Sequence, residues 1–197
     1  MTDTAPPPSD PTGPTGPTGP AGRNEPAGPP PDTLNEIGVL RRREIEARIV
    51  APLLGRFAEE FGAERVHAVA RDVIVDVART QGRALAEALG GNDIDAFASS
   101  LGAWTKDDAL RVEVVEHSAD TYAFNVTRCR YAELYRALGI AELGALLSCD
   151  RDGTMVEGFN DRMRFERTQT IMGGATHCDF RYTLEPPAET AVAAPGT

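Results

Sequence analysis

Apolar side chains recur at every fourth position between residues 45 and 61, which is the spacing of one face of an α-helix. They are Ile45, Ile49, Leu53, Phe57 and Phe61. This pattern predicts an amphipathic helix that ends at Gly62. A second helix is predicted from about residue 64 to residue 90, with inward-facing apolar residues that are Val66, Val69, Val73, Val77 and Ala84. Asp93 is a candidate N-cap for a third helix.

After Lys106 the apolar residues alternate with polar ones, which is the pattern of β-strands. The predicted order is a strand around 112–114, a turn at 118–120, a strand at 122–126, helices at 131–138 and 141–147, a strand at 164–171, a turn at 173–174 and a strand at 178–184. The sequence therefore predicts an α+β domain at residues 34–185. Its N-terminal helices are followed by a mainly antiparallel sheet with short inserted helices.

Both ends of the chain differ from this domain in composition. Residues 1–33 are dominated by Pro, Gly, Thr and Ala and include a repeat of Pro-Thr-Gly. Such a segment buries too little apolar surface to offset the entropy of ordering, so we expect a disordered spacer. The last residues, 186–197, are similar and are expected to form a flexible tail.

The chain has a net charge of −10, which argues against a nucleic-acid or anionic-membrane surface. No apolar run approaches the ~20 residues that span a bilayer, and the N-terminus does not resemble a signal peptide. Three cysteines, an odd number, fit free thiols in a reducing cytoplasm. Lys106 is the only lysine, and arginine, which supplies the other positive charges, forms forked pairs with carboxylates. We therefore expect a small-molecule substrate, with an acidic one and a homo-oligomer both left open.

The three cysteines lie near the ends of predicted elements. Cys129 follows a strand and precedes a helix, where unpaired N–H groups lower a thiol pKa and favour a nucleophile. A packing role at this junction is the alternative. Cys178 shares its strand face with Phe180 and Tyr182, which favours a buried supporting role. Asp179 then points to the opposite face, into a cleft or into solvent.

Acid–base groups lie close to these cysteines in sequence. Cys149 is followed by Asp150 and Asp152, which are candidates for a general base or for capping and turning the chain. His117 is predicted at a strand end, where it is either an acid–base group or a surface residue. The gaps between the cysteines contain no CxxC pair, so there is no local zinc signature. A divalent metal such as zinc, held by dispersed ligands, stays open, and no other cofactor is implied.

Several segments together resemble the L-2-amino-thiazoline-4-carboxylic acid hydrolase family. They are residues 42–48, 125–133, 142–144, 147–152, 157–160, 167–172 and 178–182. The similarity covers about residues 36–185. Arg130 and Asp161 stand where the family pattern is associated with proline, which affects the local backbone more than the chemistry.

The resemblance implies hydrolytic opening of a C–N bond in a cyclic amidine derived from an amino acid, with an N-carbamoyl thiol amino acid as product. Cys129 or Cys149 could then form a covalent adduct while His117 or Asp152 moves protons, or a carboxylate or a metal could activate water. Side chains expected to bind the substrate are Arg128, Arg167, Arg181 and Asn160. The alternative is a non-catalytic small-ligand or metal-binding module, in which the cysteines sense rather than react.

Overall fold

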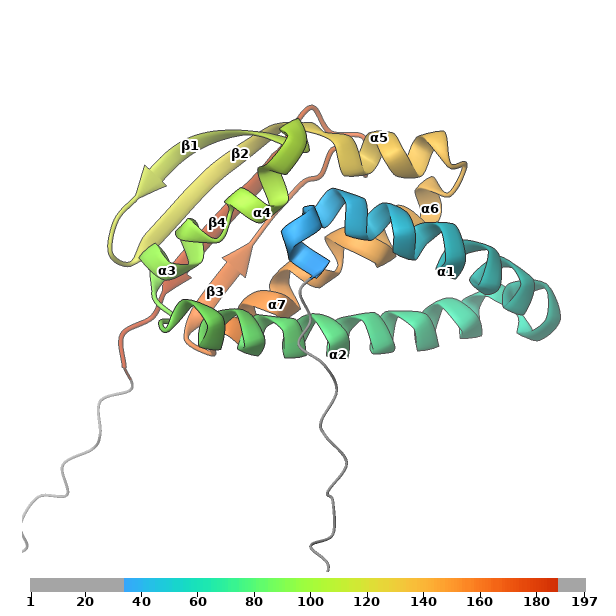
Figure 1. Cartoon of the computed structure of the whole chain (residues 1–197), viewed down its shortest axis with the longest axis horizontal. Coiled ribbons are helices and arrows are strands. Elements are labelled where there is room, and N and C mark those ends of the chain that lie inside the picture. The colour runs from blue at the N-terminus through green and yellow to red at the C-terminus, as the bar shows by residue number, and fades with distance from the viewer. Residues whose placement is uncertain (1–33, 188–197) are drawn as a thin grey trace, which may run out of the picture. The chain divides into compact units, whose positions relative to one another are not determined.

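The computed structural model describes residues 34–187 of the chain (Figure 1). Helices come first and a four-stranded antiparallel sheet follows, with short helices inserted between its strands. The predicted α+β class is therefore confirmed. The spacer predicted at residues 1–33 lies outside the described residues, as does the predicted tail from residue 188 onward.

The elements follow one another without long connections in the first two thirds of the domain. They are η1 (Leu34–Ile37), α1 (Val39–Phe61), α2 (Ala63–Leu89), α3 (Ile94–Ser99), α4 (Gly102–Thr105), η2 (Lys106–Asp108), β1 (Leu110–His117), β2 (Thr121–Cys129), α5 (Arg130–Ala137), α6 (Ala141–Gly144), the π-helical turn η3 (Ala145–Cys149), α7 (Arg151–Phe159), β3 (Met163–Glu166) and β4 (Cys178–Leu184). The helix boundaries at Gly62 and Gly139 lie where the sequence predicted them, because both glycines adopt a positive φ.

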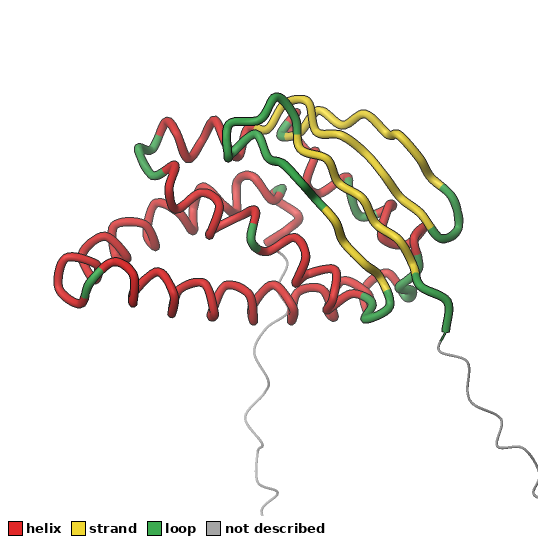
Figure 2. The backbone as a smooth tube through the Cα atoms, turned by 180° about the vertical axis from the view of Figure 1, so that it is seen from behind, coloured by secondary structure: helices red, strands yellow, loops and turns green. Residues whose placement is uncertain are grey.

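The sheet has the strand order β1-β2-β4-β3, and every neighbouring pair is antiparallel. Figure 2 shows the strands as one layer with the helices gathered to one side of it. In the β2–β4 pair, Phe124 lies opposite Phe180 and Val126 lies opposite Cys178. The apolar side chains of this pair pack with α3 and α7 to form one hydrophobic cluster. A second cluster joins α1, α5 and η3.

Helices α1 and α2 form an antiparallel hairpin whose orientation differs from the prediction. The apolar stripe from Ile45 to Phe61 is exposed rather than packed, and so are Val69, Val73 and Val77. Apart from Val39 at the start of α1, the buried positions are instead small residues and two arginines: Arg42, Arg43, Ala47, Ala51, Ala78 and Gly82. The four-residue period predicts the helix, but it does not show which face of the helix packs against the core. None of the helices that the structure describes is long and apolar enough to cross a membrane.

Close backbone contact explains why small residues face inward on α2. A Cβ atom on Gly82 would lie 2.0 Å from the carbonyl oxygen of Met155 in α7. A Cβ atom on Gly158 of α7 would lie 2.1 Å from the carbonyl oxygen of Arg79. Two glycines thus let the two helices touch main chain to main chain, which fixes the position of α7 against α2.

Two further predictions are corrected in the last third of the domain. The strand predicted at 164–171 ends at Glu166, and residues 167–177 form a loop that returns to β4. Its backbone is held by Asp179, whose carboxylate accepts hydrogen bonds from the Thr168 and Gln169 amides at 3.0 and 2.9 Å. The segment from Cys149 to Asp152, where capping or turning of the chain was one expectation, joins η3 to the first turn of α7, and the Asp150 side chain makes no capping hydrogen bond there.

Candidate functional site

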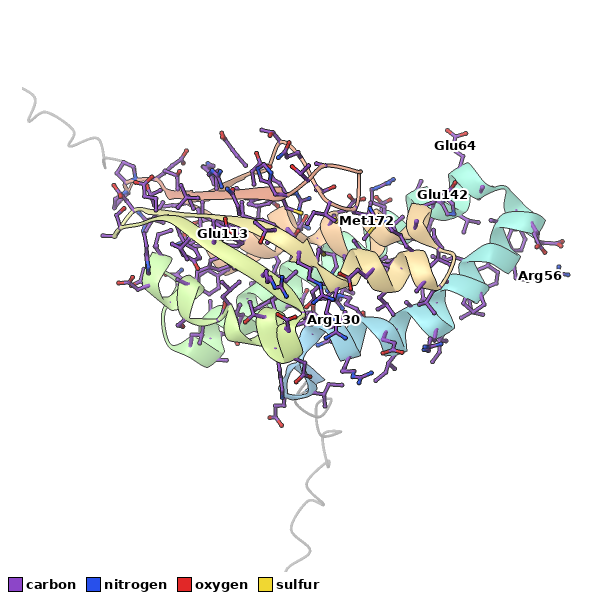
Figure 3. All side chains as sticks on the ribbon, turned by 90° about the horizontal axis from the view of Figure 1, so that it is seen from above. Arg56, Glu64, Glu113, Arg130, Glu142 and Met172 are labelled. Atoms are coloured by element: carbon purple, nitrogen blue, oxygen red, sulfur yellow. The ribbon has the colours of Figure 1, made fainter. Side chains whose placement is uncertain are left out.

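A cavity lies between the two hydrophobic clusters, and all three cysteines line it. The lining residues are Val39, Arg43, Phe97, Ser100, Leu101, Trp104, Leu110, Tyr122, Phe124, Val126, Cys129, Tyr131, Ser148, Cys149, Arg151, Asp152, Met155, Arg167, Met172, Cys178, Phe180 and Tyr182. Its volume is about 110 Å³. This is of the same order as the ~150 Å³ apolar cavity that takes benzene, so the space suits a small ring. Met172, labelled in Figure 3, reaches it from the 167–177 loop.

The π-helical turn η3 positions two of the lining residues. The Asp150 amide donates to the Ala145 carbonyl at 2.8 Å, a spacing of five residues instead of four. The extra residue in this turn lets Leu146 and Leu147 stay in the second cluster while Ser148 and Cys149 reach the cavity. Such single π turns occur often at functional sites, where they redirect a side chain.

Asp152 is the only carboxylate among the lining residues. It forms an ion pair with Arg167, whose guanidinium also donates to the Cys149 carbonyl at 3.1 Å. The Arg167 guanidinium lies over the rings of Phe165 and Phe180, at 5.5 and 5.2 Å from their centroids. Burial raises the pKa of Asp152, although Arg167 opposes that shift. The Asp152 side chain keeps 27% of its surface exposed, so it is accessible to a molecule in the cavity.

The thiols are protonated in the free protein near neutral pH. Burial raises the pKa of Cys129 to about 11, and the N–H groups of Tyr131 and Ala132 offset only part of that effect. Burial, followed by the nearby Asp152 carboxylate, raises the pKa of Cys149 to about 12. The lowered pKa expected for Cys129 is therefore wrong, because desolvation outweighs the helix N-terminus.

Cys178 combines a packing role with a place in the cavity wall. It is buried in the sheet cluster, and its sulfur accepts a hydrogen bond from the Ile171 amide at 3.2 Å. Burial raises the pKa of its thiol as well. The supporting role inferred from its strand face agrees with this geometry.

Sequence reasoning did not select Arg43 and Arg151, two buried arginines that also line the cavity. Arg43 forms an ion pair with Glu46 at 2.5 Å. Arg151 donates to the side-chain oxygen of Gln81 at 2.5 Å, and no carboxylate of residues 34–187 forms an ion pair with it. Burial lowers the pKa of Arg151 to about 10, so it still carries its charge at neutral pH. The only signal for Arg151 in the sequence was its position between Asp150 and Asp152, two candidate acid–base residues.

The structure leaves five of the predicted site residues outside the cavity lining. The His117 ring pairs with Asp95 at 2.9 Å. The other four make local contacts: Arg128 with Asp108 and Glu133, Arg181 with the Phe124 carbonyl and Asn125, Asn160 with the Asn92 carbonyl, and Asp179 with the Thr168 and Gln169 amides. These contacts support strands, a helix end and a loop rather than a bound ligand.

Within the part of the chain that the structure describes, no three His, Cys, Asp or Glu side chains converge as metal ligands. The thiols and Asp152 influence one another's pKa across the cavity, yet their arrangement does not form a ligand set. The groups that face the cavity are therefore three thiols, one carboxylate and three guanidinium groups in an otherwise mainly apolar and aromatic wall.

Fold and site together define a small α+β protein with a ring-sized internal cavity that carries excess positive charge. Residues 42–182 match the family model described as L-2-amino-thiazoline-4-carboxylic acid hydrolase, and the chain belongs to this family. Membership supports a hydrolase function. No curated protein matches the chain.

Solved structures also resemble this chain at a distance. One is the phenol-responsive sensory domain of the transcription activator PoxR with phenol, at 9% identity and a TM-score of 0.45, over 68% of this chain and 72% of that one. Another is trafficking protein particle complex subunit 3 from Naegleria fowleri covalently bound to palmitic acid, at 12% identity and a TM-score of 0.45, over 74% of this chain and 96% of that one.

Proposed function

We propose that this protein is a hydrolase that opens a small cyclic amidine bearing a carboxylate, such as 2-aminothiazoline-4-carboxylate. Family membership supports the reaction class. The observation that carries the proposal is the buried Arg151 guanidinium, which faces a ring-sized cavity without a carboxylate partner in residues 34–187. A buried cation that makes no direct ion pair is costly, and the Glu46 and Asp152 carboxylates, which act on Arg151 without contacting it, offset only part of that cost. An anionic ligand paired with Arg151 would reduce the remainder.

The substrate carboxylate pairs with Arg151 in this proposal, and the ring lies against the aromatic wall. Arg43 and Arg167 also line the cavity, but each is already paired with a carboxylate, Glu46 and Asp152 respectively. Arg151 is therefore the arginine best suited to a forked pair with the substrate. Sequence reasoning had assigned this role to Arg128, Arg167 or Arg181, of which only Arg167 lines the cavity.

Asp152 acts as the general base in the proposed reaction. Its carboxylate takes a proton from water as the water oxygen bonds to the amidine carbon, which gives a tetrahedral intermediate. The intermediate collapses by breaking one of the two ring bonds at that carbon, C–N or C–S, and the leaving nitrogen or sulfur takes the proton from Asp152. Arg167 holds the Asp152 carboxylate in place through their ion pair. Because burial raises the Asp152 pKa, the carboxylate is a stronger base than an exposed aspartate.

The product identifies the bond that breaks. Cleavage of the ring C–N bond leaves the carbamoyl group on sulfur and frees an amine. Cleavage of the ring C–S bond leaves the carbamoyl group on nitrogen and frees a thiol. The N-carbamoyl thiol expected from the family resemblance therefore requires C–S cleavage, and not the C–N opening that was expected with it. A thiol reagent added to the quenched reaction separates the two outcomes.

A cysteine nucleophile is the alternative route at the same site. Cys149 and Cys129 are protonated at rest, so an adduct requires that Asp152 first remove the thiol proton. Single Cys→Ser variants distinguish the routes. Retention of full rate by both variants supports direct attack by water.

The function is tested with a substrate pair that differs only in the carboxylate. Arg151→Gln should raise the KM for 2-aminothiazoline-4-carboxylate by about 10²-fold or more, and leave turnover of 2-aminothiazoline, which lacks the carboxylate, unchanged. Arg128→Gln is the matched control, because this half-buried arginine lies outside the cavity. Absence of ring opening by the wild-type protein refutes the hydrolase, and equal effects of Arg151→Gln on both compounds refute the anchor.

The second candidate function is a non-catalytic module that binds a small apolar ring. The mainly aromatic and aliphatic wall and the protonated thiols favour it. Calorimetry should then show binding of the substrate pair without turnover. The cytoplasmic location expected from three free thiols stays a prediction of either function.

A further inference from the structure

The α1–α2 hairpin exposes a long row of large apolar side chains, which we call the hairpin stripe. Its members are Ile45, Ile49, Leu53, Phe57 and Phe61 on α1, and Val69, Val73 and Val77 on α2. Their exposed fractions run from 42% at Val77 to 63% at Phe61. Single exposed apolar residues are ordinary, whereas a continuous series of this kind marks an interaction surface.

The α1 part of the hairpin stripe has the geometry of a helix-packing ridge. Side chains four residues apart stand next to each other along a helix, and Phe57 and Phe61 lie 6.2 Å apart between ring centroids. Two ridges of this spacing interdigitate in the commonest class of helix pair. A two-fold axis brings the same ridge of two copies together, which is how most homodimers form.

The exposed area matches what a dimer needs. At ~150–200 Å² for a side chain of this size, these exposed fractions leave roughly 700 Å² of apolar surface on each copy. A stable interface of standard size buries about 800 Å² per partner. The aromatic pair at Phe57 and Phe61 supplies the kind of anchor that dominates binding energy.

Charge favours a second copy over a lipid surface. Residues 39–89 contain nine arginines and eight Asp and Glu residues, so the hairpin is almost neutral although the chain carries −10. Several of these charges neutralise each other along the helix, as Arg48 and Arg56 do with Glu44 and Glu59. Arg56 and Glu64 point outward beside the hairpin turn (Figure 3). Anionic headgroups attract a surface with an excess of basic residues, which this nearly neutral hairpin does not have, while two neutral hairpins approach without repulsion.

We propose that two copies of this chain associate through the hairpin stripe. The opposite side of the same hairpin serves the cavity, since Arg43 of α1 lines it and Gln81 of α2 accepts the hydrogen bond from Arg151. Association therefore covers the outer side of α1, which carries Arg43, and of α2, which binds Arg151 through Gln81. The proposal does not depend on the reaction carried out in the cavity.

Analytical ultracentrifugation of the full chain tests this association. The wild-type protein should sediment at twice the mass of one chain over about 1–100 µM, and its unfolding temperature should rise with concentration. The double variant Leu53→Gln/Phe57→Gln should dissociate, with a Kd at least ~100-fold weaker. Val115→Gln is the matched control, because Val115 on β1 is 59% exposed and lies outside the hairpin.

Three results would overturn the proposal. A wild-type chain that is monomeric throughout this range excludes the dimer. Retention of the dimer by the double variant excludes the hairpin stripe as its interface. A monomer that binds vesicles of phosphatidylcholine and phosphatidylglycerol, and loses that binding in the double variant, assigns the stripe to a lipid surface instead. Should the double variant fail to fold by circular dichroism, Val73→Gln and the wild-type concentration series decide the question.

Discussion

Replacing Gly82 by alanine should destabilise the domain, although alanine is the better helix former. The added Cβ lies 2.0 Å from the Met155 carbonyl oxygen and 2.8 Å from the Phe159 nitrogen, both main-chain atoms of α7. Atoms in contact stand ~3.5 Å apart, so α2 and α7 must separate by more than about 1 Å. Neither atom can rotate away as a flexible side chain would.

The expected magnitude combines two opposing effects. Overpacking in a core costs ~1–3 kcal/mol and more where the structure cannot yield, so we take about 3 kcal/mol for a clash between two backbones. Alanine gains about 1 kcal/mol over glycine in a helix. The net loss of about 2 kcal/mol corresponds to a fall in Tm of roughly 4–8 °C for a domain of this size. Gly55→Ala is the control, since a Cβ at Gly55 of α1 meets nothing within 4 Å.

Urea and thermal unfolding followed by circular dichroism measure both variants against the wild-type protein. Gly55→Ala should raise the Tm by about 2 °C, because only the propensity gain operates there. A Gly82→Ala protein as stable as Gly55→Ala would refute the close contact between α2 and α7. Since α7 carries Asp152, a displacement of about 1 Å should also lower ring opening by up to 10²-fold.

Three further outcomes are expected. Asp152→Asn should slow ring opening at least ~100-fold, because it removes the general base. Wild-type activity should fall on acidification at a pH above the ordinary pKa range of aspartate, because burial raises the Asp152 pKa. A loss of activity that begins only near pH 4 would contradict this. The free energy of unfolding should fall as the pH rises above about 9, because the thiols ionise there in the unfolded chain but ionise in the folded protein only near pH 11 for Cys129 and pH 12 for Cys149. Constant stability in urea titrations at pH 8.5 and 10.5 argues against it. His117→Gln should keep full activity, and a large loss would place the imidazole in the reaction.

Much of the fold was predictable because its signals are local. Alternation around Tyr122–Val126 and Cys178–Leu184 marked the two central strands, and Gly62 and Gly139 marked helix ends. The strand predicted at 164–171 was too long, because the Thr168 and Gln169 amides donate to the carboxylate of Asp179, which lies eleven and ten residues further along the chain. The local pattern of apolar and polar residues does not reveal a competing hydrogen-bond acceptor on another strand.

The site was predictable in part. The cysteine segments were singled out, and the structure brings all three thiols, Asp152 and Arg167 into one cavity. Arg128 and Arg181 were selected beside cysteines in sequence, yet each is occupied by local acceptors. Arg151 was passed over, since the absence of a carboxylate partner is a property of its surroundings in space.

The sequence by itself determined the periods of the elements, the α+β class and the family, because these depend on neighbouring residues and on ordered motifs. The tertiary structure alone decided which face of the α1–α2 hairpin is buried and which charges reach the cavity. It also reversed the expected shift of the Cys129 pKa. Burial and desolvation are sums over atoms from distant parts of the chain, and no local pattern contains those sums.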